Sequence, residues 1–437
     1  MPIRDAGARV VSVEDEHHRR ALPNMPARGY TAANAGTNRA PQSSLVNGHQ
    51  AMTYANAMTA AEIETSYSAE ANGTVVSYPG NGVNPPGTHE RLTLDAIARE
   101  LAAIKGYRYA GDYDPASRYE GHLYFVPQET MLSSQARALA IASEHDLFGG
   151  VAPYPFVATK TITHPLVDDG ARVPEGWSHR FCDRVRDDVL YGFSAFSLED
   201  ARRAGKHLLT QGPARVKPAQ GIGGSGQATA LDAAALDVVL AALDPDAIHQ
   251  HGLVLEQDLT EVTTYSVGQV QVSGLRITYY GTQRLTPNNR GEQVYGGSSL
   301  VIVKGDFDAL LGLDLEPPAR LAVQQAKRYD AAATREFPEL FASRRNYDVA
   351  QGLDAEGRRR SGVLEQSWRV GGATPAELPA IKAFLVRPQL QTVRASSVEV
   401  YGECDVPPEA EVIFRGVDPR AGLLTKYGIV ESHGNLH

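Results

Sequence analysis

The stretch RVKPAQGIGGSGQ, residues 215–227, places a lysine four residues ahead of a cluster of four glycines. Glycine adopts backbone conformations that other residues avoid, and it lets amide N–H groups approach a ligand closely. A Walker loop needs its lysine after the glycines, and a dinucleotide fingerprint needs a helix that opens at them. Here Lys217 comes first, and the helix begins only near Asp232. We therefore expect a strand, a glycine-rich loop, a second short strand and then a helix, an arrangement that can cradle phosphate.

Composition excludes several classes of protein. The 437 residues suffice for two or three structural units, and the net charge of −9 argues against a general nucleic-acid binder. The two cysteines, Cys182 and Cys404, form no C-x-x-C pair. No apolar run reaches the roughly 18 residues that cross a membrane, and the first residues lack the apolar core of a signal peptide. We expect a cytoplasmic protein that has neither a nucleic-acid nor a membrane partner.

Changes in pattern along the chain predict four regions. Residues 1–70, rich in Ala, Asn, Ser, Thr and Gly, are expected to form a disordered or loosely packed arm. Strands and amphipathic helices alternate over 71–155, including a helix expected over 133–147. Residues 156–385 contain the glycine loop and then long alternating stretches typical of antiparallel strands. Residues 386–437 have strand and turn signals and are expected to form a β-rich extension.

Charged residues recur at the ends and centres of the expected strands. Glu256 ends the strand GLVLEQ, while Asp348 and Glu365 lie on the two strands of a predicted hairpin, with Arg369 four residues further on. Carboxylates on adjacent antiparallel strands can converge on Mg²⁺, which prefers oxygen ligands. Arginine can stabilise the charge that develops in phosphoryl transfer. The two carboxylates can also be a plain exposed pair, but like charges opposite each other repel, so a bound cation gives them a reason to coexist.

This order of lysine, glycine loop, Glu-x-x-Leu and Asp … Glu-x-x-x-Arg resembles the ATP-grasp superfamily over roughly residues 155–385. The segment NYDVAQGLDAEGRRRSGVLEQSWRVGGATPAEL also resembles an uncharacterised bacterial family labelled biotin carboxylase-like. The resemblance implies an α/β (α+β) ATP-grasp fold over 156–385, with ATP in the cleft between two subdomains. The region 71–155 would be the small pre-ATP-grasp domain, and 386–437 the C-terminal extension.

The resemblance also implies nucleotide-binding residues. Lys217 and Lys160 would contact phosphate oxygens, although Lys206 is a rival to Lys160. The mobile loop over the phosphates would consist of Gly223, Gly224, Ser225 and Gly226. The adenine hinge would consist of Glu256, Gln257 and Leu259, with Glu261 as the nearest acidic residue for the ribose.

Metal and substrate residues follow in the same way. Asp348 and Glu365 would hold Mg²⁺, or Mn²⁺ in its place, and Arg369 would be the catalytic arginine. The family pattern has Asn between its Glu and Arg, whereas this chain has Ser367, whose hydroxyl is a weaker ligand. Arg276 and Arg284, beside a polar segment over 288–299, are candidates for binding a substrate carboxylate.

The implied reaction is that of an ATP-dependent ligase. The γ-phosphate would pass to a substrate carboxylate, and an amine or thiol would then displace phosphate from the acyl phosphate, so that ADP and phosphate are released. Both substrates would be small molecules, and dimers are common among proteins of this resemblance. Two alternatives remain open at this point: activation of bicarbonate, as in biotin carboxylase, and an ATP-binding regulatory or scaffold protein without turnover.

Overall fold

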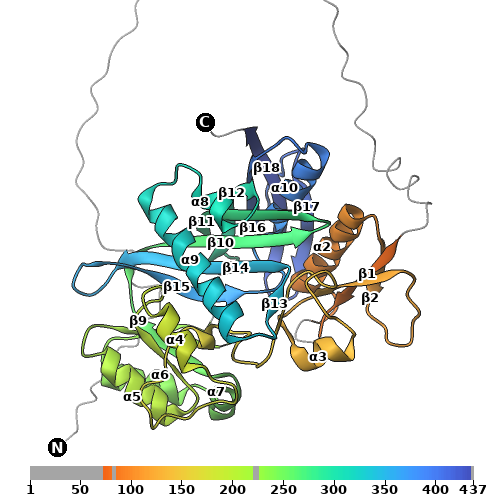
Figure 1. The fold of residues 1–437 in the computed structure, drawn as a ribbon. Helices are drawn as coiled ribbons and strands as arrows, with labels where there is room; N and C mark the ends of the chain where they lie inside the picture. The colour runs from red at the N-terminus through yellow and green to blue at the C-terminus, as the bar shows by residue number, and fades with distance from the viewer. Residues whose placement is uncertain (1–71, 81–84, 220–225, 435–437) are drawn as a thin grey trace, which may run out of the picture. The chain divides into compact units, whose positions relative to one another are not determined.

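The computed structural model describes residues 72–80, 85–219 and 226–434, which belong to one compact unit of the chain. The arm predicted over residues 1–70 lies outside the described residues. The strands of the described residues form four sheets, and helices lie between them in the sequence (Figure 1). The mixed α/β class predicted from the sequence is thus confirmed.

A small parallel sheet forms the N-terminal part, with strand order β2-β1-β3. Helix α2 packs its apolar side, which includes Leu94, Ile97 and Leu101, into a buried cluster with residues of this sheet. The spacing of these side chains repeats with the helical period, which is why the sequence predicts the helix correctly. The elements are β1 (Gly73–Tyr78), α2 (His89–Lys105), β2 (Arg108–Asp112) and β3 (His122–Pro127).

The helix expected over residues 133–147 is much shorter than predicted. Helix α3 covers only Ser133–Ala138. Ala140 has a left-handed backbone with φ of 57°, which a continuing helix cannot accommodate. Beyond it, the Asp146 carboxylate accepts the backbone N–H groups of Ala142 and Ser143, each at 2.9 Å. These side-chain to backbone hydrogen bonds stabilise a turn in place of further helix.

A three-stranded sheet of order β13-β5-β4 joins this N-terminal part to the C-terminal half of the chain. Nearby, Ser343 accepts a hydrogen bond from the backbone of Gly149 at 3.1 Å and donates to the carbonyl of Leu147 at 2.6 Å. The strands are β4 (Met131–Leu132), β5 (Gly150–Ala152) and β13 (Phe341–Ala342).

A four-stranded antiparallel sheet of order β6-β9-β7-β8 carries the segment with the glycine loop. The sequence Ala228–Ala230 is the short strand β8, as expected, and helix α6 begins directly after Asp232, which caps it. Apolar residues of the strands and helices form one buried cluster. The elements are β6 (Gly192–Ala195), α5 (Leu198–Leu208), β7 (Ala214–Pro218), α6 (Ala233–Ala241), α7 (Pro245–His251) and β9 (Leu253–Gln257).

The largest sheet has eight strands in the order β15-β14-β10-β11-β12-β16-β18-β17, and all of its pairs are antiparallel. The C-terminal strands continue this sheet, because β16 pairs along β12. The strands are β10 (Thr260–Val272), β11 (Leu275–Pro287), β12 (Gln293–Lys304), β14 (Arg344–Leu353), β15 (Arg359–Ser367), β16 (Thr392–Tyr401), β17 (Glu411–Asp418) and β18 (Gly422–Gly434).

Helices cover both faces of the large sheet. Helix α9 (Pro317–Glu336) crosses the sheet in Figure 1 and packs with Tyr347 and Val349 of β14, whereas α10 (Thr374–Val386) packs in a second cluster with Tyr279 of β11. Because side chains alternate along a strand, residues 344, 346 and 348 point to the face opposite Tyr347. This face carries the polar side chains of β14. The remaining helices are α4 (His179–Val185) and α8 (Phe307–Leu311).

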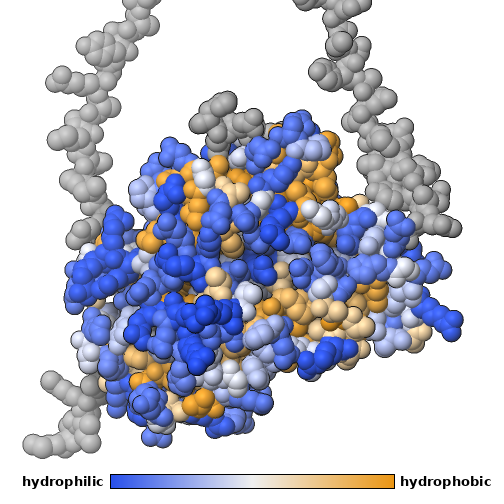
Figure 2. Space-filling model, viewed as in Figure 1, coloured by the Kyte–Doolittle hydropathy of each residue, from blue (hydrophilic) through white to orange (hydrophobic). Residues whose placement is uncertain are grey.

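Hydrophilic residues cover most of the face shown in Figure 2, among smaller groups of hydrophobic ones. None of the helices within the described ranges combines the length and the apolar character that a membrane span requires.

Candidate functional site

Glu256 lies at the end of β9 in a closed cluster of charged side chains. Lys217 on β7 is opposite Val254 in the register, so its side chain shares a face with that of Glu256. The Lys217 ammonium forms an ion pair with Glu256 Oε1, and His164 Nε2 lies 3.1 Å from Oε2. All three side chains are at most 4% exposed. Both carboxylate oxygens of the predicted adenine contact are therefore already engaged.

The electrostatics of this cluster favour the charged form of Glu256. Burial alone would raise the pKa of the carboxyl, but the charge of Lys217 and the hydrogen bond from His164 outweigh it and hold the pKa at about 2. His164 Nδ1 is buried and has no hydrogen-bond partner among the described residues. Sequence reasoning missed His164, because a lone histidine 92 residues from its partner carries no spacing signal.

Asp348 and Glu365 form a second, more open cluster. They are directly opposite each other on β14 and β15, the two strands of the predicted hairpin, where the register shifts between Asp348 and Val349. Lys160 Nζ lies 3.0 Å from Glu365 Oε2, and Glu365 retains 32% of its side-chain exposure. Burial and the neighbouring charge of Glu365 raise the pKa of Asp348 to about 6. The structure thus brings both predicted metal carboxylates and one predicted phosphate lysine together.

A short buried segment joins the two clusters. Lys160 begins a single 3₁₀ turn, η1 (Lys160–Ile162), and reaches Glu365, while His164 reaches Glu256. The segment is fixed between them: Thr161 donates to the carbonyl of His251 at 3.1 Å, and the Thr163 hydroxyl lies 3.1 Å from that of Tyr329. Lys206, the rival to Lys160, is an exposed residue of α5.

Ser367 is the last residue of β15, and Arg369 follows two residues beyond the end of the strand. Ser367 is opposite Asn346, and Arg344 Nη1 donates to the carbonyl oxygens of Ser367 at 3.2 Å and Arg369 at 2.6 Å. The Arg369 guanidinium extends to the N-terminal part of the chain, where its Nε lies 3.3 Å from Glu129 Oε2. The predicted catalytic arginine therefore faces a carboxylate that is 51% exposed.

The other hinge residues have diverse environments. The backbone N–H of Gln257 donates to the carbonyl of Tyr191 at 2.8 Å, and Leu259 is 7% exposed. Glu261 is exposed, with φ of 51°, in the irregular beginning of β10. No described contact links Glu261 to either carboxylate cluster.

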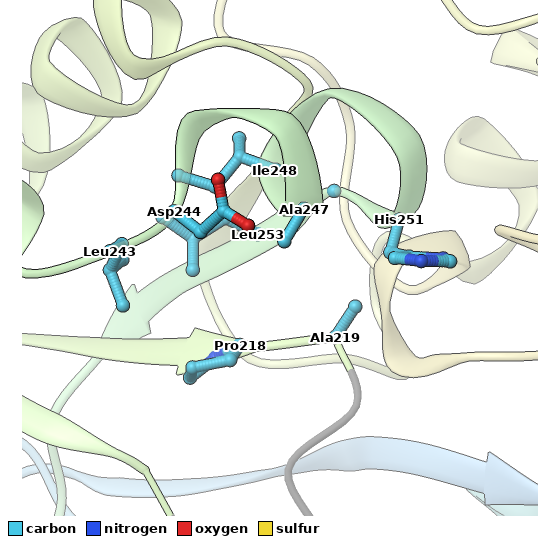
Figure 3. Close-up of a pocket in the computed structure, with 9 residues that line it drawn as sticks. Pro218, Ala219, Leu243, Asp244, Ala247, Ile248, His251 and Leu253 are labelled. Carbon is cyan, nitrogen blue, oxygen red and sulfur yellow. The ribbon is translucent and has the colours of Figure 1, made fainter. Parts of the chain in front are cut away.

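Most of the predicted phosphate loop, Gly223, Gly224 and Ser225, lies outside the described residues. Gly226 is described and has φ of 74°, a conformation that favours glycine. Figure 3 shows a small pocket of about 80 Å³ beside the end of β7, lined mainly by apolar residues of the helix-covered side, with Asp244 and His251 at its edge. Because Pro218 and Lys217 point to opposite faces of β7, this pocket does not include the predicted phosphate lysine.

The guanidinium groups of the two candidate substrate arginines donate hydrogen bonds to other groups of the chain. Arg276 is exposed at the β10–β11 turn and donates to Gln271 Oε1 at 2.9 and 3.3 Å. Arg284 donates to the carbonyl oxygens of Gly296 and Ser397, both at 3.1 Å. The structure does not bring Arg276 to the carboxylates.

A buried network of hydrogen bonds and one ion pair, which the sequence analysis did not predict, reaches Asp348 of the open cluster. Arg344 and Glu377 form an ion pair with 1% and 0% side-chain exposure. The Tyr279 hydroxyl lies 2.6 Å from Glu377 Oε1 and 3.0 Å from Asn346 Oδ1. Asn346 Nδ2 in turn lies 2.8 Å from Asp348 Oδ1. Helix α10 is thereby connected through Glu377, Tyr279 and Asn346 to a predicted metal ligand.

The donor set of the open cluster fits a hard divalent cation. Two carboxylates, an amide and a hydroxyl gather on one face of adjacent strands, at Asp348, Glu365, Asn346 and Ser367. Oxygen donors of these kinds bind Mg²⁺ and Mn²⁺. Burial, and after it the negative charge of Glu365, raise the pKa of Asp348, so a cation that joins the two carboxylates would favour their charged forms.

Several solved structures resemble the chain at low sequence identity. Biotin carboxylase from Campylobacter jejuni, in a βγ-ATP complex, has a TM-score of 0.47, 9% identity, and coverage of 82% of this chain and 87% of that one. D-alanyl-alanine synthetase A from Vibrio cholerae has a TM-score of 0.41, 11% identity, and coverage of 70% and 91%. A RimK-domain ATP-grasp protein from Sphaerobacter thermophilus has a TM-score of 0.33, 13% identity, and coverage of 68% and 93%.

ATP-grasp proteins are thus among the structures that the chain resembles, although at these scores the chemistry has to come from the chain's own residues. A comparison of the sequence with curated proteins found no match. A family model described as "Protein of unknown function (DUF3182)" matches residues 78–428, most of the chain. The chain belongs to this DUF3182 family.

Proposed function

We propose that the protein is an ATP-dependent ligase that activates a carboxylate and joins it to an amine. The observation that carries the proposal is the pairing of Asp348 with Glu365, at the centre of a face where Lys160 reaches the same pair. The two carboxylates outnumber the one ammonium of Lys160, so the pair favours a further cation, and ATP is normally bound together with one.

The lysines support a phosphate site between the two clusters. Lys217 forms an ion pair with Glu256, and Lys160 forms one with Glu365. Each ammonium group has three N–H donors, so both lysines can contact phosphate oxygens while they keep their carboxylate partners. Mg²⁺, held by Asp348 and Glu365, would neutralise the charge of the phosphates.

Substrate carboxylate and amine are proposed to bind between Arg369 and Glu129. Their 3.3 Å contact joins two parts of the chain, and Glu129 is half exposed. A substrate carboxylate can replace Glu129 as the partner of the Arg369 guanidinium. Glu129 would then be available to bind a cationic amine. Arg284 is a lesser candidate for the same role, because two backbone carbonyls already engage it.

The proposed reaction has two steps. A carboxylate oxygen of the substrate attacks the γ-phosphorus of ATP, the bond to the ADP oxygen breaks, and an acyl phosphate forms. The amine nitrogen then attacks the acyl carbon, phosphate leaves and the nitrogen loses a proton. The side chains contribute position and charge, with Arg369 next to the oxygens that gain charge in the first step.

Release of ADP tests this proposal. The full chain is incubated with ATP, Mg²⁺ and pools of small carboxylic acids and amines, and ADP is measured with each partner left out in turn. The proposal predicts ADP release that requires both an acid and an amine and that Glu365→Gln abolishes. ADP release that requires only bicarbonate would support carboxylate activation of the biotin carboxylase kind. Tight ATP binding without ADP release under any mixture would favour a protein that binds ATP without turnover.

A further inference from the structure

Asn346 connects the open carboxylate cluster to the buried network beneath it. It lies two residues before Asp348 on β14, so both side chains point to the same face, and it is directly opposite Ser367. Its side-chain amide is largely buried, since the residue is only 7% exposed. Nδ2 is 2.8 Å from Asp348 Oδ1, and Oδ1 is 3.0 Å from the hydroxyl of Tyr279.

The hydrogen count at Tyr279 does not balance in this arrangement. Its hydroxyl has one hydrogen but lies next to two acceptors, Glu377 Oε1 at 2.6 Å and Asn346 Oδ1 at 3.0 Å. Both oxygens of Glu377 accept hydrogen bonds from Arg344, whose Nε and Nη2 donate to them at 2.9 to 3.2 Å. One of the two oxygen contacts of Tyr279 therefore has no hydrogen, which is unfavourable for buried groups.

The opposite orientation of the amide balances the count. If Nδ2 faces Tyr279, it donates to the hydroxyl oxygen, and the hydroxyl hydrogen is donated to Glu377. Each contact then has one donor and one acceptor. The amide oxygen would now face Asp348 Oδ1, at the separation of 2.8 Å that Nδ2 has in the structure. An ionised carboxylate oxygen and an amide oxygen at this distance repel each other unless a cation lies against both of them.

We propose that Asn346 is a ligand of the divalent cation held by Asp348 and Glu365. We further propose that its side-chain amide rotates when the cation binds, so that Oδ1 and Nδ2 exchange places. Without the cation, Nδ2 donates to Asp348. With it, the amide oxygen binds the cation, while Tyr279 accepts the N–H and donates to Glu377. This inference rests on the proposed function, because the cation is the one that accompanies ATP.

Ser367 is less suited to this role than Asn346. Its hydroxyl oxygen lies 3.5 Å from Nη1 of Arg344, a permanently charged group that competes with a metal for the same oxygen. An amide oxygen is also a better ligand for a hard cation than a neutral hydroxyl. Tyr279, Glu377 and Arg344 are positioning residues, since they act on the cation through Asn346.

The test measures binding of Mn²⁺, without turnover, to the full chain saturated with a non-hydrolysable ATP analogue. Free Mn²⁺ is followed by electron paramagnetic resonance for wild type and four variants. Asn346→Leu removes the amide, Asn346→Asp keeps an oxygen, Tyr279→Phe removes the hydroxyl that accepts the N–H, and Ser367→Ala removes the rival ligand. Thermal unfolding of each variant without metal reports whether it is folded.

We expect Asn346→Leu to weaken Mn²⁺ binding about tenfold or more, Tyr279→Phe to weaken it less, and Ser367→Ala to weaken it least. Asn346→Asp should retain Mn²⁺ binding and gain more thermal stability from Mn²⁺ than wild type, because the metal relieves an added carboxylate. Unchanged Mn²⁺ binding in Asn346→Leu, or a loss in Asn346→Asp equal to that in Asn346→Leu, would overturn the inference.

Failure of the proposed function gives a different result. If wild type binds neither the ATP analogue nor Mn²⁺, the nucleotide site and the ligand role of Asn346 are both wrong. If wild type binds both and Glu365→Gln loses Mn²⁺ while Asn346→Leu does not, the nucleotide site remains and only the role of Asn346 is wrong.

Discussion

The two carboxylate clusters of the protein have opposite electrostatic balance. Glu256 is buried between Lys217 and His164, and its pKa is lowered to about 2. Asp348 is opposite Glu365, accepts hydrogen bonds from the neutral side chains of Asn346 and Ser266, and has its pKa raised to about 6. The first cluster carries one counter-charge for its one carboxylate, whereas in the second the ammonium of Lys160 faces two carboxylates.

This difference separates a structural requirement from a binding capacity. A buried carboxylate with resident partners contributes to the folded state and is costly to disturb. A pair of carboxylates that repel each other lowers stability unless a cation joins them. We infer that Glu256 positions the lysine and histidine around it, while Asp348 and Glu365 are held ready for a ligand.

The largest effect is expected from Lys217→Met. The substitution keeps most of the side-chain volume but leaves Glu256 buried without its ammonium partner. We expect a loss of about 3 to 5 kcal/mol in the free energy of unfolding, measured with urea. Lys206→Met, in the exposed lysine of α5, is the matched control and should have little effect. A loss below about 1 kcal/mol in Lys217→Met would show that the closed cluster does not depend on its internal charge balance.

Acid should remove a somewhat smaller contribution from the same cluster. The folded pKa of Glu256 is lowered from 4.5 to about 2, so its stabilisation is fully present above pH 4.5 and is lost as the pH falls through 2. A shift of this size corresponds to about 3 kcal/mol. Unfolding free energies of wild type and Glu256→Gln, measured from pH 6 to pH 2, should converge toward the acid end. A difference that is constant over this range would contradict the lowered pKa.

Asp348→Asn should have a smaller effect of the opposite sign. In the wild type, the folded pKa of Asp348 is raised, so the charged carboxylate disfavours folding. Wild-type stability should therefore rise as the pH falls from 6 toward 4. At pH 7 we expect the variant to be as stable as wild type or more so, by less than about 2 kcal/mol. ATP should raise its thermal unfolding temperature equally with and without Mg²⁺, because only the effect of the metal is lost. A clear loss of stability in the variant would mean that the open cluster is balanced after all.

Arg276→Ala should have the smallest effect. Its side chain contacts Gln271 at an exposed turn, and no described contact links it to either cluster. ATP affinity, measured by calorimetry, should stay within about twofold of wild type, as is usual for surface substitutions away from a site. A large loss of affinity would place the nucleotide or substrate elsewhere than between the two clusters.

The sequence predicts what depends on local pattern. The alternating pattern predicts the hairpin of β14 and β15, but the pairing of Asp348 with Glu365 also depends on a register shift between Asp348 and Val349, which alternation alone does not reveal. The strand on each side of the glycine loop follows from its turn residues in the same way. The resemblance to a known superfamily supplies the roles of these residues, which no alternation can.

Contacts between distant residues could not be predicted in this way. His164 meets Glu256 from 92 residues away, and Arg344 meets Glu377 from 33 residues away. Each is a single residue without a spacing signal, and its role depends on which sheets and helices pack together. The left-handed backbone at Ala140, which precedes the turn held by Asp146, is similarly invisible to helical periodicity.

Calorimetric titration of the full chain with ATP, in the presence and absence of Mg²⁺, tests the central claim most directly. The account predicts that wild type binds ATP, that Mg²⁺ tightens the binding, and that Asp348→Asn and Glu365→Gln each remove the effect of Mg²⁺ while leaving the metal-free binding largely intact. Absence of ATP binding by wild type at millimolar nucleotide, or an effect of Mg²⁺ that survives in both variants, would contradict it.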